Sequence, residues 1–438
     1  MRLALCTLAF LFAPFATTAA PPQVPSELAD YVAKPDGSFS WKLAGKTESD
    51  AGTVYTIDLV SQTWHDIKWD HKLQVYVAKG VKPQPTMVLW NQGGTPGAAS
   101  GLLGIELSKK VNAPVAFLFG IPKQPLFGGK KEDALIAETF VRYLETKDGS
   151  WPLLFPMVKR LVRAMDALQA FAKEEWKSEV KDFVVTGASK RGWTTWLTAA
   201  TGDTRVRAIA PLVIDTLNIP QQMKNQVEAF GKPSEMIKDY VERKLIPLPK
   251  TEAAERLWTM IDPWTYRERI TVPKLIVCGT NDPYWPLDAL NTYWDGLRGE
   301  KWILYVPNAG HDLVEVDKSG KRELLPARAI NTLAAFCRAQ IFDKEMPTLT
   351  WVCKEADGLC RLAVTAGAKP KSVRVWRAES ESRDFRKARW VEDATAAAPF
   401  EVTAPSKGYV AFYAACEYEV DGFTYTLCTQ LRILEPKK

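Results

Sequence analysis

The sequence predicts an α/β protein in which a doubly wound, mostly parallel sheet is followed by an immunoglobulin-like β-sandwich. Two observations carry this prediction. Short apolar runs alternate with helical patterns from residue 87 to residue 342, and after Met346-Pro347 only short alternating runs with turn signals remain. Alternation of strands and helices is typical of a parallel sheet covered on both faces, whereas many short strands in succession are typical of a sandwich.

The N-terminus has the pattern of a signal peptide. Arg2 is followed by an apolar stretch over 3–15 and by the small residues of 16–20, as in a cleavage region. The apolar stretch is shorter than the ~20 residues that a membrane-spanning helix needs, and no later stretch is long enough. We therefore expect residues 1–20 to be removed and the mature chain to be periplasmic or secreted, with no transmembrane segment. An uncleaved N-terminal anchor is the alternative.

The charge balance excludes one class of partner. The formal net charge is only +6, it falls by one when Arg2 leaves with the leader, and the charges of both signs are interspersed. A nucleic-acid-binding face would need a denser basic cluster than residues 374–389, which also contain acidic side chains. We expect no nucleic-acid partner.

The predicted sheet opens with antiparallel strands, because apolar and polar residues alternate over 53–78. Its later strands are expected at 87–90, 115–119, 183–186, 208–214, 275–278 and 303–306, and its helices at 132–145, 152–173, 190–200, 287–297 and 327–342. About sixty residues separate 214 from 275, more than a crossover needs, and they hold three short helical patterns (221–230, 233–243 and 251–261). We interpret residues 216–270 as a lid over the site, within an α/β domain spanning 21–345.

The remaining residues, 346–438, form the predicted sandwich domain. Its strands are expected at 349–354, 360–365, 372–377, 400–402, 409–418 and 424–433. Of the seven cysteines in the chain, Cys6 leaves with the leader. Two pairs flank short turns and are the favoured disulfides in an exported chain: Cys353–Cys360 and Cys416–Cys428. Cys278 and Cys337 are expected to be buried free thiols.

The segment Gly187-Ala188-Ser189-Lys190-Arg191-Gly192 follows an apolar strand and precedes a helical pattern. This is the sequence of a nucleophile elbow, in which a strained turn exposes a serine hydroxyl above the sheet. The motif departs from G-x-S-x-G, because Arg191 stands in place of the second glycine. We expect Arg191 to reach a carboxylate, either within the protein or on the substrate. The alternative for Ser189 is an ordinary helix N-cap.

The chain has only three histidines, which makes the search for a base short. His311 follows the strand at 303–306, where an α/β-hydrolase keeps its base, whereas His65 and His71 lie in the early antiparallel region. Asp282 follows the strand at 275–278, and the order Ser189, Asp282, His311 matches that of the fold. Asp215, at the end of the preceding strand, is the alternative acid.

An acyl-transfer site also needs two donors for the oxyanion. We expect the backbone N–H of Lys190 to be one, and the N–H of Gln92 or Gly93, in the loop after the strand at 87–90, to be the other. Trp193 and Trp285 lie in segments near the site and are candidate substrate contacts. His65-Asp66 and Asp70-His71 are better explained by a polar hairpin than by a metal site, so no metal and no cofactor are expected.

Several long motifs together resemble the PhoPQ-activated pathogenicity-related family. They are Ser61-Gln62-Thr63-Trp64, Trp69-Asp70-His71, residues 132–137, Trp151-Pro152, Pro156-Met157, Ala164-Met165-Asp166, residues 187–196 and Ser382-Arg383-Asp384-Phe385. The resemblance implies an exported α/β-hydrolase with a C-terminal immunoglobulin-like domain, and a triad at Ser189, Asp282 and His311. The glucuronoyl methylesterases have a similar elbow, which suggests carbohydrate ester chemistry.

These observations predict a serine hydrolase that cleaves carboxylic esters through an acyl-enzyme. Its substrate is expected to be an ester of a small molecule, a carbohydrate or a lipid. A peptidase or amidase with the same triad is one alternative, since the sequence of the lid does not separate esters from amides. A non-catalytic binding protein with the same fold is the other.

Overall fold

The computed structural model describes residues 24–316, 319–323, 326–393 and 399–437. The predicted signal peptide, residues 1–20, lies outside the described residues. In the described part of the chain, no helix combines the length and the apolar character that a membrane crossing would need.

A nine-stranded sheet forms the centre of the molecule, in the order β1-β2-β3-β5-β4-β6-β7-β8-β9. Its strands are β1 (Ser40–Ser49), β2 (Gly52–Trp64), β3 (Ile67–Ala78), β4 (Thr86–Asn91), β5 (Val115–Leu118), β6 (Asp182–Ala188), β7 (Val206–Leu212), β8 (Lys274–Gly279) and β9 (Lys301–Val306). β1, β2 and β3 pair antiparallel, β3 pairs antiparallel with β5, and all strands from β5 to β9 along the sheet are parallel. The predicted doubly wound, mostly parallel sheet is confirmed, and β1 is an additional edge strand.

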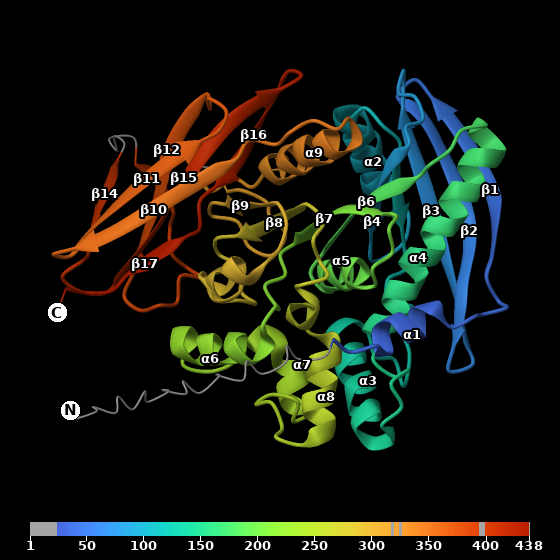
Figure 1. The fold of residues 1–438 in the computed structure, drawn as a ribbon, viewed down its shortest axis with the longest axis horizontal. Coiled ribbons are helices and arrows are strands. Elements are labelled where there is room, and N and C mark those ends of the chain that lie inside the picture. Colours follow the sequence, from blue (N-terminus) through green and yellow to red (C-terminus); the bar gives the residue numbers. More distant parts are fainter. Residues whose placement is uncertain (1–23, 317–318, 324–325, 394–398, 438) are drawn as a thin grey trace, which may run out of the picture.

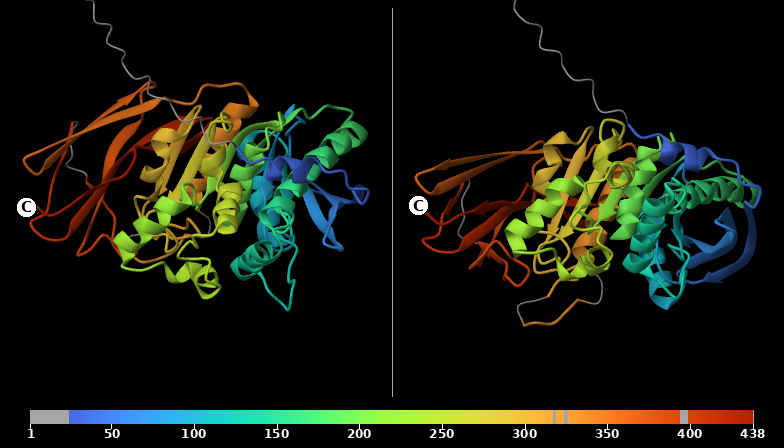
Figure 2. Two further views of the ribbon diagram at one scale, coloured as in Figure 1. Left: turned by 60° about the horizontal axis from the view of Figure 1, so that its bottom comes forward. Right: turned by 90° about the horizontal axis from the view of Figure 1, so that it is seen from below.

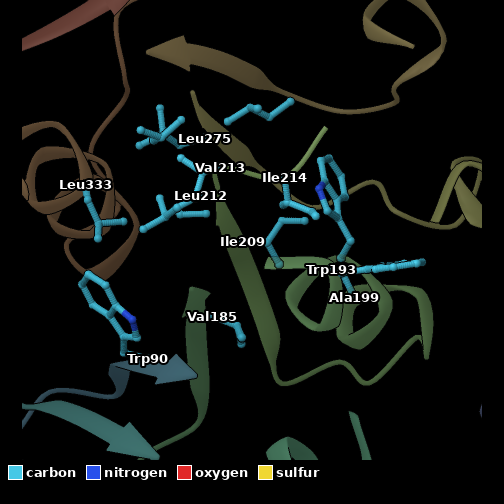
Figure 3. Packing of buried hydrophobic residues seen from close by; sticks show 14 of the residues in the cluster. Trp90, Val185, Trp193, Ala199, Ile209, Leu212, Val213, Ile214, Leu275 and Leu333 are labelled. Carbon is cyan, nitrogen blue, oxygen red and sulfur yellow. The ribbon is translucent and has the colours of Figure 1, made fainter. Parts of the chain in front are cut away.

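Helices cover both faces of this sheet (Figures 1 and 2). They are α1 (Glu27–Ala33), α2 (Ala98–Val111), α3 (Glu132–Thr146), α4 (Leu154–Phe171), the single-turn π-helix η1 (Ala172–Trp176), α5 (Lys190–Ala200) and α9 (Ala327–Ile341). α2 packs against α9, and α4 packs against α5 and β2. Figure 3 shows how side chains of the strands and helices, including Trp90, Val185, Leu212 and Leu333, meet in the resulting core.

The helix predicted at 287–297 is wrong. This segment forms two short 3₁₀ turns, η4 (Ala289–Thr292) and η5 (Trp294–Gly296). Gly296 lies against the ring of Trp264, so closely that a Cβ atom there would be 2.1 Å from the ring. The close approach of this backbone to a tryptophan fixes the local path of the chain, which periodicity alone does not reveal.

The long connection between β7 and β8 is helical, as predicted. It contains α6 (Ile219–Phe230), η2 (Glu235–Ile237), α7 (Lys238–Glu242), α8 (Glu252–Ile261) and η3 (Pro263–Tyr266), and we call residues 216–270 the β7–β8 insertion. Asp262 ties its two ends together, because its carboxylate accepts hydrogen bonds from the N–H groups of Ile219 (2.8 Å) and Trp264 (2.9 Å). Burial raises the pKa of Asp262 to about 7.

Two antiparallel sheets make up the C-terminal part. One contains β10 (Leu349–Ala356), β11 (Leu359–Ala366) and β14 (Phe400–Thr403), and the other contains β12 (Ser372–Ser380), β13 (Val391–Asp393), β15 (Tyr409–Val420), β16 (Phe423–Cys428) and β17 (Arg432–Leu434). Leu362 and Phe400 from the first sheet share a small apolar core with Val375 and Phe412 from the second. This arrangement is consistent with the predicted sandwich.

The C-terminal sheets also share the main core. Tyr413 of β15 packs against Tyr305 of β9, with ring centroids 5.2 Å apart. β16 packs against both α9 and β9, and the backbone N–H of Tyr305 donates to Cys428 Sγ (3.4 Å). The edge strand β9 is therefore covered by the C-terminal sheets, as the position of these strands in Figure 1 shows.

The structure contains one of the two predicted disulfides. Cys353 and Cys360 are bonded across the β10–β11 hairpin, with Cα atoms 6.3 Å apart. The predicted Cys416–Cys428 bridge is wrong, since both residues are free, buried thiols. In the β15–β16 register Cys416 lies opposite Leu427, the neighbour of Cys428, so the two thiols point to opposite faces of the sheet. Cys278 and Cys337 are buried and free, as predicted.

Candidate active site

Ser189 stands at a strained turn between β6 and α5. Its φ of 58° and ψ of −129° are unusual for a residue with a side chain, and strain of this kind costs on the order of 1–3 kcal/mol. The turn is possible because Gly192 follows it, where a Cβ atom would lie 2.6 Å from Ile214 Cγ2. Among the described residues Ser189 makes no side-chain capping bond to α5, so the ordinary N-cap does not explain this serine.

Asp282 and His311 meet at the carboxyl ends of two neighbouring strands, β8 and β9. Nδ1 of His311 lies 2.7 Å from Oδ2 of Asp282. The two loops are in close contact, because a Cβ atom at Gly279 would be 2.4 Å from the carbonyl oxygen of Gly310. The second carboxylate oxygen of Asp282 accepts the N–H of Tyr284 at 2.8 Å. Both oxygens of this carboxylate are thus held in place.

The other ring nitrogen of His311 is unoccupied. Nε2 is buried and has no hydrogen-bond partner in the described part of the chain, Ser189 included. The His311 ring stacks on Tyr284, with centroids 4.2 Å apart and planes 29° apart, and Tyr284 lines the same cavity as Ser189. The structure therefore joins Asp282 to His311 directly, and Tyr284, which stacks on His311, is one of the residues that line the cavity at Ser189.

The alternative candidates have other partners, although Asp215 lines one residual cavity together with Asp282. Asp215 is buried, accepts a hydrogen bond from the hydroxyl of Tyr293 and contacts Cys278 Sγ at 3.3 Å, and burial raises its pKa to about 6. His65 stacks on Trp151 at 3.7 Å. His71 contacts the hydroxyl of Ser61 at 3.1 Å.

The two candidate oxyanion donors after β4 differ in their hydrogen bonds. The N–H of Gln92 donates to the carbonyl of Leu118 (2.8 Å), so it is engaged in the sheet and does not fit the expected role. In the described ranges the N–H of Gly93 donates only to the side chain of Gln92 (3.2 Å), an acceptor that can rotate away. The N–H of Lys190 is at the first position of α5, where a helix provides no internal acceptor.

Arg191 contacts a carboxylate of the protein itself. Its guanidinium donates to both oxygens of Glu132 (2.8 and 2.7 Å) and its Nε donates to the carbonyl of Ile121 (2.6 Å). It also lies against Gly93, where a Cβ atom would be 2.6 Å from Nη2. Arg191 is thus a brace between the elbow and the loop after β4, and its polar atoms are not available as the expected substrate contact.

A charged wall beside Ser189 was missed by the sequence analysis. Nζ of Lys190, whose side chain is 7% exposed, lies 2.9 Å from Glu132 and 3.3 Å from Asp133. The hydroxyl of Tyr240 donates to Asp133 at 3.1 Å. Burial alone would raise the pKa of Glu132, but the hydrogen bonds from Arg191 and the charge of Lys190 outweigh it and hold that pKa at about 2. The sequence offered one signal for this wall: the adjacent acidic residues Glu132 and Asp133, shortly after Gly128-Gly129.

The cavity at Ser189 is small and largely apolar. Its volume is about 50 Å³. Its walls come from α3, α5, the segment after β7, the β7–β8 insertion and the loop after Asp282: Asp133, Lys190, Trp193, Ile214, Thr216, Ile219, Met223, Ile237, Tyr240, Ile246, Trp258, Tyr284 and Trp285. Both predicted tryptophans, Trp193 and Trp285, are among them. The insertion was predicted to lie over the site, but the individual residues that it contributes were not named, and neither was Tyr284, because these contacts depend on how the insertion folds back.

The strand order and the elbow after β6 are those of the α/β-hydrolase fold. A family model described as PhoPQ-activated pathogenicity-related protein matches residues 28–386. The chain belongs to this family. A relative with a curated name, autocrine proliferation repressor protein A of Dictyostelium discoideum, is 32% identical over 388 residues, which cover 82% of this chain and 76% of the relative.

Solved structures similar to this family member include esterases. Acetyl xylan esterase 1 from Thermoanaerobacterium sp. JW/SL YS485 has a TM-score of 0.49 at 14% identity, covering 74% of this chain and 96% of its own. An acetyl xylan esterase from Paenibacillus sp. R4 has a TM-score of 0.48 at 14% identity, covering 72% and 92%. A glucuronoyl esterase from Solibacter usitatus has a TM-score of 0.41 at 13% identity, covering 73% and 92%. With TM-scores below 0.5 and identities of 13–14%, these structures do not indicate the substrate of this protein. The fold is assigned from the strand order and the elbow.

Proposed function

We propose that this protein is an exported serine hydrolase that cleaves carboxylic esters through an acyl-enzyme. The observation that carries the proposal is the 2.7 Å contact between His311 and Asp282, beside a cavity that is lined by the strained Ser189. A serine hydroxyl becomes nucleophilic when a base removes its proton, and a carboxylate orients that base. Export is supported by the signal-peptide pattern and by the Cys353–Cys360 disulfide.

In the proposed reaction Ser189 attacks the ester carbonyl while Nε2 of His311 takes its proton. His311 then returns the proton to the leaving alcohol, and a water molecule, activated by His311 in the same way, releases the acid. Asp282 keeps the proton of the neutral ring on Nδ1. The N–H groups of Lys190 and Gly93 stabilise the oxyanion. Catalytic hydrogen bonds are commonly long before substrate binds. Nε2 of His311, which has no partner among the residues that the structure describes, is the acceptor that this step requires.

The cavity favours a short acyl group. A buried water needs ~10–15 Å³, so a cavity of about 50 Å³ holds only a few non-hydrogen atoms. Met223 and Trp258 contribute apolar walls, which suit an acyl chain of ~2–4 carbons better than a charged or polar one. The alcohol part of a small-molecule, carbohydrate or lipid ester then remains outside this cavity.

The test is covalent labelling with a fluorophosphonate together with hydrolysis of p-nitrophenyl acetate. Ser189→Ala is expected to abolish the adduct and to lower the rate by at least ~10³-fold. Ser61→Ala is the matched control, because the hydroxyl of Ser61 contacts a histidine outside the candidate triad, His71, and this variant is expected to keep both the adduct and the rate. Labelling that survives in Ser189→Ala, or none in the wild type, contradicts the proposal. The anilide of the same acid separates an esterase from an amidase.

A second candidate is a non-catalytic signalling or binding protein. It is favoured by the name of the Dictyostelium relative, which describes an autocrine repressor of proliferation. The comparison is between purified wild-type protein and Ser189→Ala, added to growing Dictyostelium cells. Equal repression by both proteins, without a phosphonate adduct on the wild type, would favour this candidate over the esterase.

A further inference from the structure

A loop of the C-terminal part reaches back to the candidate triad. Residues 381–390 connect β12 to β13, and we call them the β12–β13 loop. The loop contains Ser382-Arg383-Asp384-Phe385, one of the motifs that carry the family resemblance and one for which the proposed reaction has no role. Its contacts give this motif a place in the site.

The first contact is with the loop that carries Asp282. Nδ2 of Asn281, the residue directly before Asp282, donates to the carbonyl oxygen of Ala388 at 2.7 Å, with longer contacts of 3.3 Å to the carbonyls of Phe385 and Arg386. Phe385 and Asp282 also line one residual cavity of only about 10 Å³. The β12–β13 loop therefore packs closely behind this carboxylate.

The second contact is with the loop that carries His311. Nδ2 of Asn308 donates to the carbonyl of Trp390 (2.9 Å), and the N–H of Trp390 donates back to Oδ1 of Asn308 (2.8 Å). The N–H of Asn308 in turn donates to Oγ1 of Thr280 (2.9 Å). One short loop is thus hydrogen-bonded both to the segment that carries Asp282 and to the segment that carries His311. These two segments are also hydrogen-bonded to each other.

The β12–β13 loop is itself well braced. Oδ1 of Asp384 accepts the backbone N–H and the Nε of Arg386 (3.1 and 2.9 Å), and the hydroxyl of Ser380 donates to the carbonyl of Asp384 (2.9 Å). Phe385 and Trp390 are each only 2% exposed. A braced loop with buried anchors can fix the geometry of its neighbours, whereas a loose one cannot.

The same loop also touches the β7–β8 insertion. The guanidinium of Arg386 lies 4.0 Å from the centroid of the Phe230 ring and 3.2 Å from Glu235. Arg383 forms an ion pair of 2.6 Å with Asp288, in the segment that follows Trp285. The loop is consequently in contact with the segment that carries Asp282, with the segment that carries His311, and with the β7–β8 insertion, other residues of which line the cavity.

We propose that Asn281 and Asn308 are positioning residues, through which the β12–β13 loop holds Asp282 and His311 in their hydrogen-bonded arrangement. The inference rests on the proposed function, since it assigns these side chains a part in serine hydrolysis. A displacement of a catalytic group by ~1 Å can cost ~100-fold in rate. The C-terminal part is then a component of the active site rather than a separate binding module.

The test compares Asn281→Ala and Asn308→Ala with Asn291→Ala in the full-length protein. Asn291 is the matched control, because its Nδ2 also donates to a carbonyl of the C-terminal part, that of Leu431 (2.9 Å), but from η4, which carries no triad residue. For p-nitrophenyl acetate we expect kcat to fall by ~10–100-fold in the first two variants, with KM changed by less than ~3-fold. Asn291→Ala should stay within ~2-fold of the wild type.

A second readout does not depend on activity. The Nδ1 proton shared by His311 and Asp282 gives a low-field proton resonance, which is assigned by its loss in His311→Gln. We expect this resonance to be lost or broadened in Asn281→Ala and Asn308→Ala and kept in Asn291→Ala. Asn308→Asp keeps the acceptor for the N–H of Trp390 and removes the donor, so its loss of kcat should be intermediate.

The outcomes separate the two proposals. An active wild type in which Asn281→Ala and Asn308→Ala behave like Asn291→Ala overturns the positioning role and leaves the hydrolase intact. If the wild type is inactive but shows the low-field resonance, and the resonance is lost in Asn281→Ala and Asn308→Ala, the proposed hydrolase activity is overturned and the positioning role is supported. If thermal denaturation shows that either alanine variant is not folded, Asn308→Asp decides. An intermediate kcat with a weakened resonance supports the positioning role, and wild-type values of both contradict it.

Discussion

Replacement of Arg191 by alanine should destabilise the protein and disturb the candidate oxyanion loop. The side chain, 12% exposed, donates two hydrogen bonds to Glu132 and one to Ile121. A hydrogen bond that involves a charged group contributes ~1.5–3 kcal/mol. The two bonds to Glu132 count for less, because this carboxylate is 39% exposed and keeps Lys190 as a partner. We take ~1.5 kcal/mol for the Ile121 carbonyl and ~1.5 kcal/mol for Glu132.

The expected loss is thus ~3 kcal/mol of unfolding free energy, or roughly 100-fold in the unfolding equilibrium constant. Urea unfolding followed by tryptophan fluorescence measures it, with the slope of free energy on urea checked for constancy. Arg191→Lys should lose about half as much, because lysine cannot form the forked pair. The rate of ester hydrolysis should fall as well, since Arg191 lies directly against Gly93.

Arg298→Ala provides the matched control. Arg298 also makes a forked contact with a glutamate, Glu268 (2.8 and 3.1 Å), but both side chains are about half exposed. Exposed pairs of this kind contribute less than ~1 kcal/mol. If Arg191→Ala is no more destabilising than Arg298→Ala, the brace that we assign to Arg191 does not exist.

Three further predictions concern the acid, the cavity and the insertion. Asp282→Asn should lower kcat for p-nitrophenyl acetate by ~10³–10⁴-fold, whereas Asp215→Asn should stay within ~10-fold; the reverse ranking would make Asp215 the acid. Met223→Ala should widen the cavity and shift the preferred acyl chain by two or more carbons, as measured with p-nitrophenyl esters of increasing length, and an unchanged preference would place the acyl group elsewhere. The folded pKa of Asp262, about 7, exceeds its unfolded value of 3.8, so the folded state binds this proton more tightly and stability falls as pH rises from about 4 to 7, by at most ~4 kcal/mol. Asp262→Asn should flatten that part of the urea-derived stability profile, and an unchanged slope would contradict the raised pKa.

Local patterns in the sequence were sufficient for the sheet and the elbow. The strand that ends at Ala188 and the small residues around Ser189 are properties of adjacent residues. Asp282 and His311 could be predicted because the carboxyl ends of neighbouring parallel strands meet at one edge of the sheet.

Most of the features that the sequence analysis missed depend on contacts between distant segments. The role of Arg191 is set by Glu132, 59 residues away, and nothing in the sequence around either residue indicates that the two form a pair. The error at Cys416 and Cys428 came from a hairpin register shifted by one residue, which reverses the face of a side chain. The insertion residues that line the cavity carry an ordinary helical pattern, and only the packed structure shows that their apolar faces turn toward Ser189.

The packing of β16 against β9 has consequences for the synthesis of the chain and for the design of shortened or fused versions. A ribosome releases a chain from its N-terminus at ~5–20 residues per second, so the segment that shields β9 is among the last to leave it. Until then β9 is a bare sheet edge, which recruits strands of other chains. A premature stop after residue 346 should therefore yield an aggregating fragment rather than a smaller working protein, and fusion partners belong at the chain ends rather than at that junction.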